Sequence, residues 1–89
     1  MVHTTLNLRK NTWEYIGTFP CRLQVRGASV EVQVTSGAVP NSSNGAVTLS
    51  SDFGFTESEM EDSFSGVASP TSVYARCLTL GGSVSVSHA

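Results

Sequence analysis

Two segments of fourteen residues constrain the fold of this chain more than any other part of its sequence. Residues 21–34 (CRLQVRGASVEVQV) and 73–86 (VYARCLTLGGSVSV) both alternate in side-chain character with the period of a β-strand. A glycine turn interrupts each segment near its middle, Gly27-Ala28 in the first and Gly81-Gly82 in the second. Two strands joined by such a turn are typical of a β-hairpin, so the sequence predicts an all-β fold that contains two hairpins.

The alternation also predicts which side chains face the core. In the first hairpin these are Cys21, Leu23, Val25, Val30, Val32 and Val34. If the two strands of this hairpin pair through the Gly27-Ala28 turn, Gln24 lies opposite Glu31, and Arg26 lies diagonal to Glu31, close enough for a weak ion pair. In the second hairpin the core-facing residues are Val73, Ala75 and Cys77. Arg76 is its one charged residue, and so uncharged a hairpin needs a cover, either the rest of the domain or another subunit.

Further strands are expected at residues 2–8, 13–16 and 46–50, with a bend or short strand at 51–55. Segments rich in Ser, Asn, Gly and Pro separate them and predict loops. An 89-residue chain predicts one domain, which would span residues 1–89. We expect a small antiparallel β-sandwich or jelly-roll-like barrel of about seven to eight strands, with the terminal strands close together.

Acidic side chains concentrate in residues 57–62, which hold four of the seven Asp and Glu residues. Thr56 is suited to cap a single helical turn there, with the acidic side chains beside the positive end of the helix. The alternative is a calcium site, but the order of these residues does not match the calcium-loop motif. We therefore expect a solvated acidic segment without a metal, and leave open whether it faces a basic patch on a partner.

No group of residues predicts catalysis. His3 and His88 lie near the two ends of the chain, and a metal site would need further ligands even if the terminal strands pair. Cys21 and Cys77 occupy core-facing positions, where a thiol behaves as a small hydrophobic side chain, and a disulfide between them stays an open alternative. The sequence therefore predicts a protein that is not an enzyme and that has no cofactor.

Charge and hydropathy bear on the partners of the chain. A net charge of −2 and scattered basic residues argue against a nucleic-acid surface. Because no apolar segment is long enough to span a bilayer and no signal peptide is evident, we expect synthesis in a cytoplasm and no membrane partner. Only 13% of the residues are charged, against about 25% in typical domains. So little charge suits contact with neighbouring chains, and equally suits strands exposed on one face.

Three further features carry a resemblance to a known class of proteins. They are the segment Asn11-Thr12-Trp13-Glu14-Tyr15, the loop at residues 39–45, and the ending at 72–76 and 83–87. In this order the chain resembles small bacteriophage virion proteins, as a pattern over most of its length and without a specific motif. The resemblance implies a β-sandwich that decorates or cements a capsid, or belongs to a tail or head fibre, usually as a symmetric oligomer. The acidic segment and the two cysteines depart from the pattern.

We therefore expect a virion structural protein, made in the host cytoplasm, that serves as a capsid decoration or cement protein. Its expected partners are further copies of itself, as a trimer, and the major capsid protein or another virion protein. The residues expected to make these contacts are Val2, Leu6, Leu8, Val39, Pro40, Asn41, Tyr74, Arg76 and Leu78. Two alternatives remain: a tail or fibre-attachment component, and a glycan-binding module that uses Trp13 and Tyr15.

Overall fold

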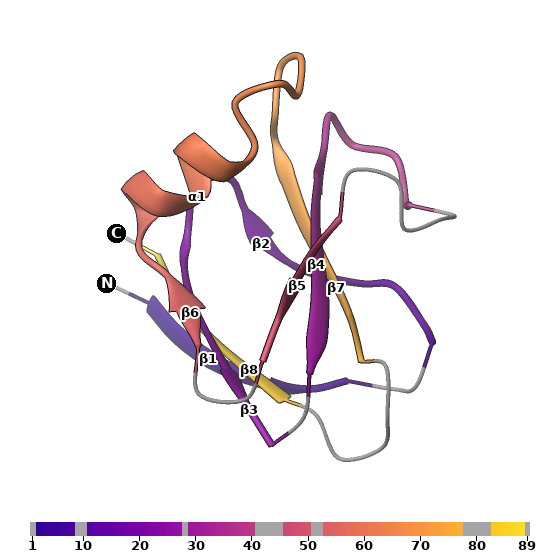
Figure 1. Ribbon diagram of the computed structural model, residues 1–89, viewed down its shortest axis with the longest axis vertical. Helices are drawn as coiled ribbons and strands as arrows, with labels where there is room; N and C mark the ends of the chain where they lie inside the picture. Colours follow the sequence, from indigo (N-terminus) through magenta and orange to yellow (C-terminus); the bar gives the residue numbers. More distant parts are fainter. Residues whose placement is uncertain are drawn as a thin grey trace.

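The computed structural model describes residues 2–8, 11–27, 29–40, 46–50, 53–77 and 83–88, and at positions 2–4, 87 and 88 the backbone alone. Within these residues the chain forms two four-stranded antiparallel sheets and one short helix, which confirms the predicted small β-sandwich (Figure 1). The strands are β1 (Val2–Asn7), β2 (Glu14–Thr18), β3 (Arg22–Arg26), β4 (Val30–Thr35), β5 (Val47–Leu49), β6 (Gly54–Phe55), β7 (Ser72–Cys77) and β8 (Ser83–His88). The helix is α1 (Glu57–Ser63).

The first sheet has the strand order β1-β8-β3-β6, and the second has the order β2-β7-β4-β5. Strands β1 and β8 pair along their whole length, from Val2 opposite His88 to Asn7 opposite Ser83. The two ends of the chain therefore lie on the same side of the molecule (Figure 1). This confirms the expectation that the terminal strands are close together.

Neither predicted hairpin forms. Strand β3 pairs with β8 and β6 in the first sheet, whereas β4 pairs with β7 and β5 in the second. Likewise β7 belongs to the second sheet and β8 to the first. Both connections therefore pass from one sheet to the other. Gly27 begins the first connection with a φ of 87°, a conformation that glycine adopts readily, and the Gly81-Gly82 turn lies outside the described residues.

The physical reason is that alternation specifies which face of a strand is apolar but does not specify its partner strand. Crossing between sheets lets the apolar faces of β3 and β4 lie against each other across the core. The predicted pairing of Gln24 with Glu31 and the predicted Arg26–Glu31 ion pair are therefore wrong. Arg26 instead donates from Nε to Ser85 Oγ at 3.4 Å, within the first sheet.

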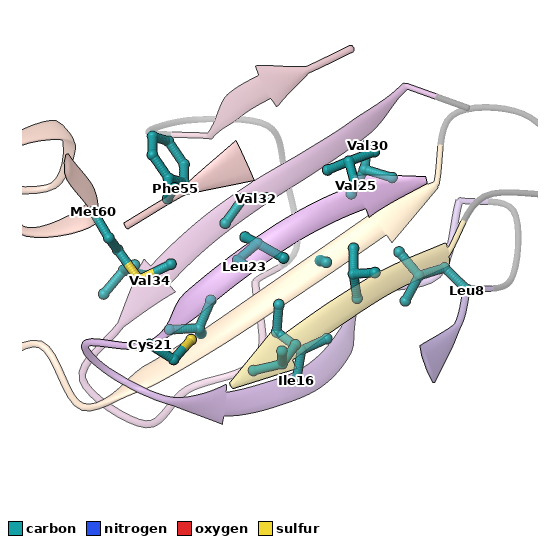
Figure 2. Close-up of a cluster of buried hydrophobic side chains, with 14 of the residues drawn as sticks. Leu8, Ile16, Cys21, Leu23, Val25, Val30, Val32, Val34, Phe55 and Met60 are labelled. Atoms are coloured by element: carbon teal, nitrogen blue, oxygen red, sulfur yellow. The ribbon is translucent and has the colours of Figure 1, made fainter. Parts of the chain in front are cut away.

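The core lies between the two sheets, and apolar side chains from both point into it (Figure 2). Every side chain that the alternation predicted to face inward is buried, from Cys21 to Val34 and again at Val73, Ala75 and Cys77. Both cysteines are buried and neither forms a disulfide. The structure therefore confirms the predicted faces of the strands although their pairing differs.

The helix α1 begins after Thr56, the residue that the sequence offers as a cap, but it runs for seven residues, Glu57–Ser63, and not for the single turn expected. The Thr56 side chain accepts a hydrogen bond from the Glu59 backbone N–H, and the Glu59 side chain accepts one from the Thr56 backbone N–H. These reciprocal bonds form a capping box, which satisfies two backbone donors at the helix start. Met60 is fully buried and Phe64 packs edge-to-face on Phe55 with ring centroids 6.1 Å apart. The helix is thus anchored by its apolar face, and its acidic side chains are exposed.

Candidate interaction surface

The outer face of the second sheet gathers residues from three strands. Since Val73, Ala75 and Cys77 point into the core, strand alternation places Tyr74 and Arg76 on the outer side of β7. Tyr15 of β2 lies opposite Tyr74, and Glu31 of β4 lies opposite Arg76. Trp13, just before β2, joins them through its contact with Arg76. We name this set the aromatic face; it consists of Trp13, Tyr15, Glu31, Tyr74 and Arg76.

Arg76 is held on this face by two neighbours. Its guanidinium donates from Nε to Glu31 Oε1 at 3.0 Å and also from Nη2 to the same oxygen. The guanidinium carbon lies 4.6 Å from the centroid of the Trp13 ring, a cation–π contact. The Arg76 and Glu31 side chains are 18% and 9% exposed, so water screens their attraction only in part. Arg76 therefore has one orientation imposed by charge and by stacking.

Tyr15 is the exposed ring of the aromatic face. It is 54% exposed, whereas Tyr74 beneath it is 8% exposed. The two rings pack edge-to-face, with centroids 5.8 Å apart and an interplanar angle of 73°. The Tyr15 hydroxyl also shares a hydrogen bond of 3.1 Å with Thr18 Oγ1. These contacts orient the ring while leaving much of its surface to solvent.

Sequence reasoning found part of this surface. Tyr74 and Arg76 are two of the expected contact residues. They alternate with Val73, Ala75 and Cys77, which the sequence predicts to face the core, so alternation predicts that both face outward, and the structure places both on the aromatic face. Trp13 and Tyr15 were assigned to a separate glycan-binding hypothesis, although they lie beside Tyr74 and Arg76. Glu31 was missed as a member. Alternation did place it on the outward side of its strand, but nothing in the sequence indicated that β4 pairs with β7.

The other predicted contact residues are spread over different parts of the fold. Leu6 in β1 is half-buried against the core, and Leu8 just after it is 7% exposed. Val39, in the loop after β4, is 64% exposed, whereas Pro40 next to it is buried. Val2 contributes its backbone to β1, and its side chain, Asn41 and Leu78 lie outside what the structure describes. Leu8 and Pro40 thus present little area to a partner, and the same holds for Tyr74, which is 8% exposed.

The described residues were also searched for metal-binding groups and for membrane-spanning helices. Among them, no group of three or more His, Cys, Asp or Glu side chains is placed to hold a metal ion. No helix in the same part of the chain is long and apolar enough to cross a membrane.

Burial, and secondarily the charge of Glu57, raises the pKa of the Cys21 thiol to about 11. The thiol therefore stays protonated near neutral pH, which is unlike the thiolate that a nucleophilic cysteine needs.

Comparison with known proteins found no family model, no curated protein and no solved structure that matches this chain. The geometry of the aromatic face, with the sequence, is therefore the basis for a functional proposal.

Proposed function

We propose that this chain is a bacteriophage virion structural protein of the capsid decoration type, which works by binding other virion proteins rather than by catalysis. The observation that supports binding is the aromatic face, where the exposed Tyr15 ring packs on the buried Tyr74, and Arg76 of the same sheet stacks on Trp13. Trp, Tyr and Arg are the residue types that most often dominate the energetics of protein interfaces. The assignment to a virion has two further grounds: the resemblance of the sequence to small bacteriophage virion proteins, and the low content of charged residues.

The aromatic face is also preorganised for binding a protein. Arg76 is fixed by Glu31 and Trp13, and Tyr15 is oriented by Tyr74 and Thr18. Ordering a long side chain at an interface costs about 0.5–1.5 kcal/mol, and much of that cost is already met in the folded chain. In the proposed complex, Tyr15 inserts into the capsid surface, and the Arg76–Glu31 pair beside it contributes hydrogen bonds at the margin.

The test is co-sedimentation of the chain with purified capsids of the bacteriophage that carries its gene. Tyr15→Ser removes the exposed ring of the aromatic face, and Phe53→Ser is a matched control. Phe53 is 64% exposed and precedes β6 of the first sheet, with its backbone oxygen accepting a hydrogen bond from Val25. We expect the wild type and Phe53→Ser to sediment with capsids, and Tyr15→Ser to bind about 30-fold more weakly, as for an interface hot spot.

Equal binding of Tyr15→Ser and wild type would remove the aromatic face from the proposal. No binding of any variant to the capsids would count against the decoration role, and the same experiment with purified tails would then test the tail or fibre-attachment alternative.

A glycan-binding function is the second candidate, because Trp13 and Tyr15 do share one face of the molecule. Two features make it the weaker one: the guanidinium of Arg76 lies over the Trp13 ring, and Tyr74 is buried. A sugar would therefore have the single exposed ring of Tyr15 on which to stack. Tryptophan fluorescence during titration with oligosaccharides tests this candidate, since Trp13 is the only Trp of the chain. A saturable shift supports it, and unchanged emission counts against it.

A further inference from the structure

The edge strands of the two sheets differ in how they are protected from pairing with another chain. Strands β6 and β5, at one edge of each sheet, have two and three residues. Short edge strands offer few backbone groups to a neighbour. Strand β2 has five residues, but its register shifts between Tyr15 and Gly17, and such a bulge interrupts a pairing edge. Three of the four edges thus carry a protection that natural proteins commonly use.

The fourth edge, β1, carries none of these protections. It has six residues and pairs with β8 without a break in register. Its sequence, VHTTLN, has no Asp, Glu, Lys, Arg, Pro or Gly. In the part of the chain that the structure describes, β8 is the one strand that pairs with it. Alternate backbone N–H and C=O groups of β1 therefore point away from the sheet, as in strands that accept another strand.

We propose that β1 pairs antiparallel with β1 of a second copy of this chain, so that two first sheets join into one continuous sheet of eight strands. The pairing is isologous, with a twofold axis between the two copies of β1. A register with Thr4 opposite Thr4 places Val2 opposite Leu6 and His3 opposite Thr5. No charged pair of like sign meets in this register, and the half-buried Leu6 gains an apolar neighbour.

The occupant is a second copy because the edge is self-complementary. A partner strand with charged side chains would find no opposite charge on β1. A second copy of β1 brings no Asp, Glu, Lys or Arg and therefore needs no opposite charge. The pairing predicts a dimer and so differs from the trimer expected from the sequence. A ring of three would need a second long, unbroken edge on each copy, and β2, β5 and β6 do not supply one.

This inference deepens the proposed assembly function, since it says how copies join, but it uses a different surface from the aromatic face. The proposed function can therefore fail while the pairing stands, and the reverse. Tyr15→Ser should leave the dimer intact, and a variant that breaks the dimer should still bind capsids through Tyr15, although more weakly where two linked copies bind together.

The experiment measures mass by light scattering after size exclusion over a dilution series, for the wild type and two lysine variants. Thr5 is exposed on the outer surface of the first sheet, with its Oγ1 3.4 Å from Ser85 Oγ, so Thr5→Lys leaves the core untouched. The matched control is Thr48→Lys, an exposed position in the middle of β5. Both variants must show the circular dichroism and thermal unfolding of a folded chain.

We expect twice the monomer mass for the wild type and for Thr48→Lys. In Thr5→Lys the pairing edge carries one ammonium group from each copy, so the dissociation constant rises by about tenfold or more. Amide hydrogen exchange gives a second readout that does not depend on a substitution. On going from dilute to concentrated protein, alternate amides of β1 gain protection, while the amides of β5 do not change.

A monomer at every concentration overturns the proposal, as does a stable trimer. Equal dissociation constants for Thr5→Lys and Thr48→Lys place the contact elsewhere and also overturn it. Failure of β1 amides to gain protection in a dimer leads to the same conclusion.

Discussion

Replacing Arg76 by methionine tests whether the charge pair of the aromatic face stabilises the fold. The substitution keeps an unbranched apolar stem on β7 but removes the guanidinium. Two hydrogen bonds to Glu31 Oε1 and the stacking on Trp13 are lost together. Glu31 is only 7% exposed in the wild type, so its carboxylate loses this cation in a place where water can replace it only in part.

The expected magnitude follows from these contacts. A hydrogen bond to a charged group contributes about 1.5–3 kcal/mol net, and a partly exposed cation–π contact about 0.5–1 kcal/mol. Breaking a fully buried pair costs about 3–5 kcal/mol, but the 18% exposure of the Arg76 side chain admits some screening. We expect a loss of about 3 kcal/mol. A domain of this size has about 4–13 kcal/mol of stability in total, so the loss is large.

Urea unfolding, followed by far-UV circular dichroism, measures the effect. We expect the midpoint of Arg76→Met to fall with an unchanged dependence on urea, which reports lost stability rather than a changed unfolded state. Arg22→Met is the matched control, because Arg22 is an exposed arginine of β3. A double-mutant cycle with Glu31→Gln should give a coupling free energy of about 1–2 kcal/mol.

Two results would refute this reasoning. One is a loss for Arg76→Met of under about 0.5 kcal/mol, the range of ordinary surface substitutions, or one equal to that of Arg22→Met. The other is strict additivity of Arg76→Met and Glu31→Gln, since residues that interact directly are coupled.

Two further predictions concern the packing of the sandwich. Gly54→Ala should lower the free energy of unfolding by about 1–3 kcal/mol, because the added Cβ would collide with the Leu23 carbonyl oxygen and lie 3.0 Å from Gln24 Cα. Gly66→Ala, where the Cβ meets nothing within 4 Å, is the control, and equal urea midpoints would contradict the prediction. The second prediction concerns pH: the pKa of Cys21 is raised from 9.0 to about 11, so the folded chain holds this proton more tightly than the unfolded chain. The stability that Cys21 contributes should be complete below pH 9 and be lost as the pH rises to about 11. The difference in unfolding free energy between wild type and Cys21→Ala should shrink over that range, and a constant difference would show that the thiol is not shifted.

The aromatic face shows which features of the candidate site can be predicted from the sequence and which cannot. The outward direction of Tyr74 and Arg76 could be predicted because it depends on alternation within one strand. The partners of Arg76 could not, because Glu31 is 45 residues away along the chain and comes beside it through the register of β4 with β7. The prediction that Arg26 pairs with Glu31 was wrong for the same reason: it assumed a partner strand that local sequence does not specify.

The sequence by itself determined the approximate positions of the strands, the faces that are buried, and the capped start of α1. Each of these depends on residues close together in the chain: a period of two for the strands, and Thr56 with Glu59 for the cap. The tertiary structure alone decided that the glycine connection after β3 crosses between sheets, and it alone built the aromatic face. Alternating strands of similar length can pair in many different orders, and each order forms the same backbone hydrogen bonds between neighbouring strands. The choice among them depends on burying both apolar faces in one core, which is a property of the whole chain.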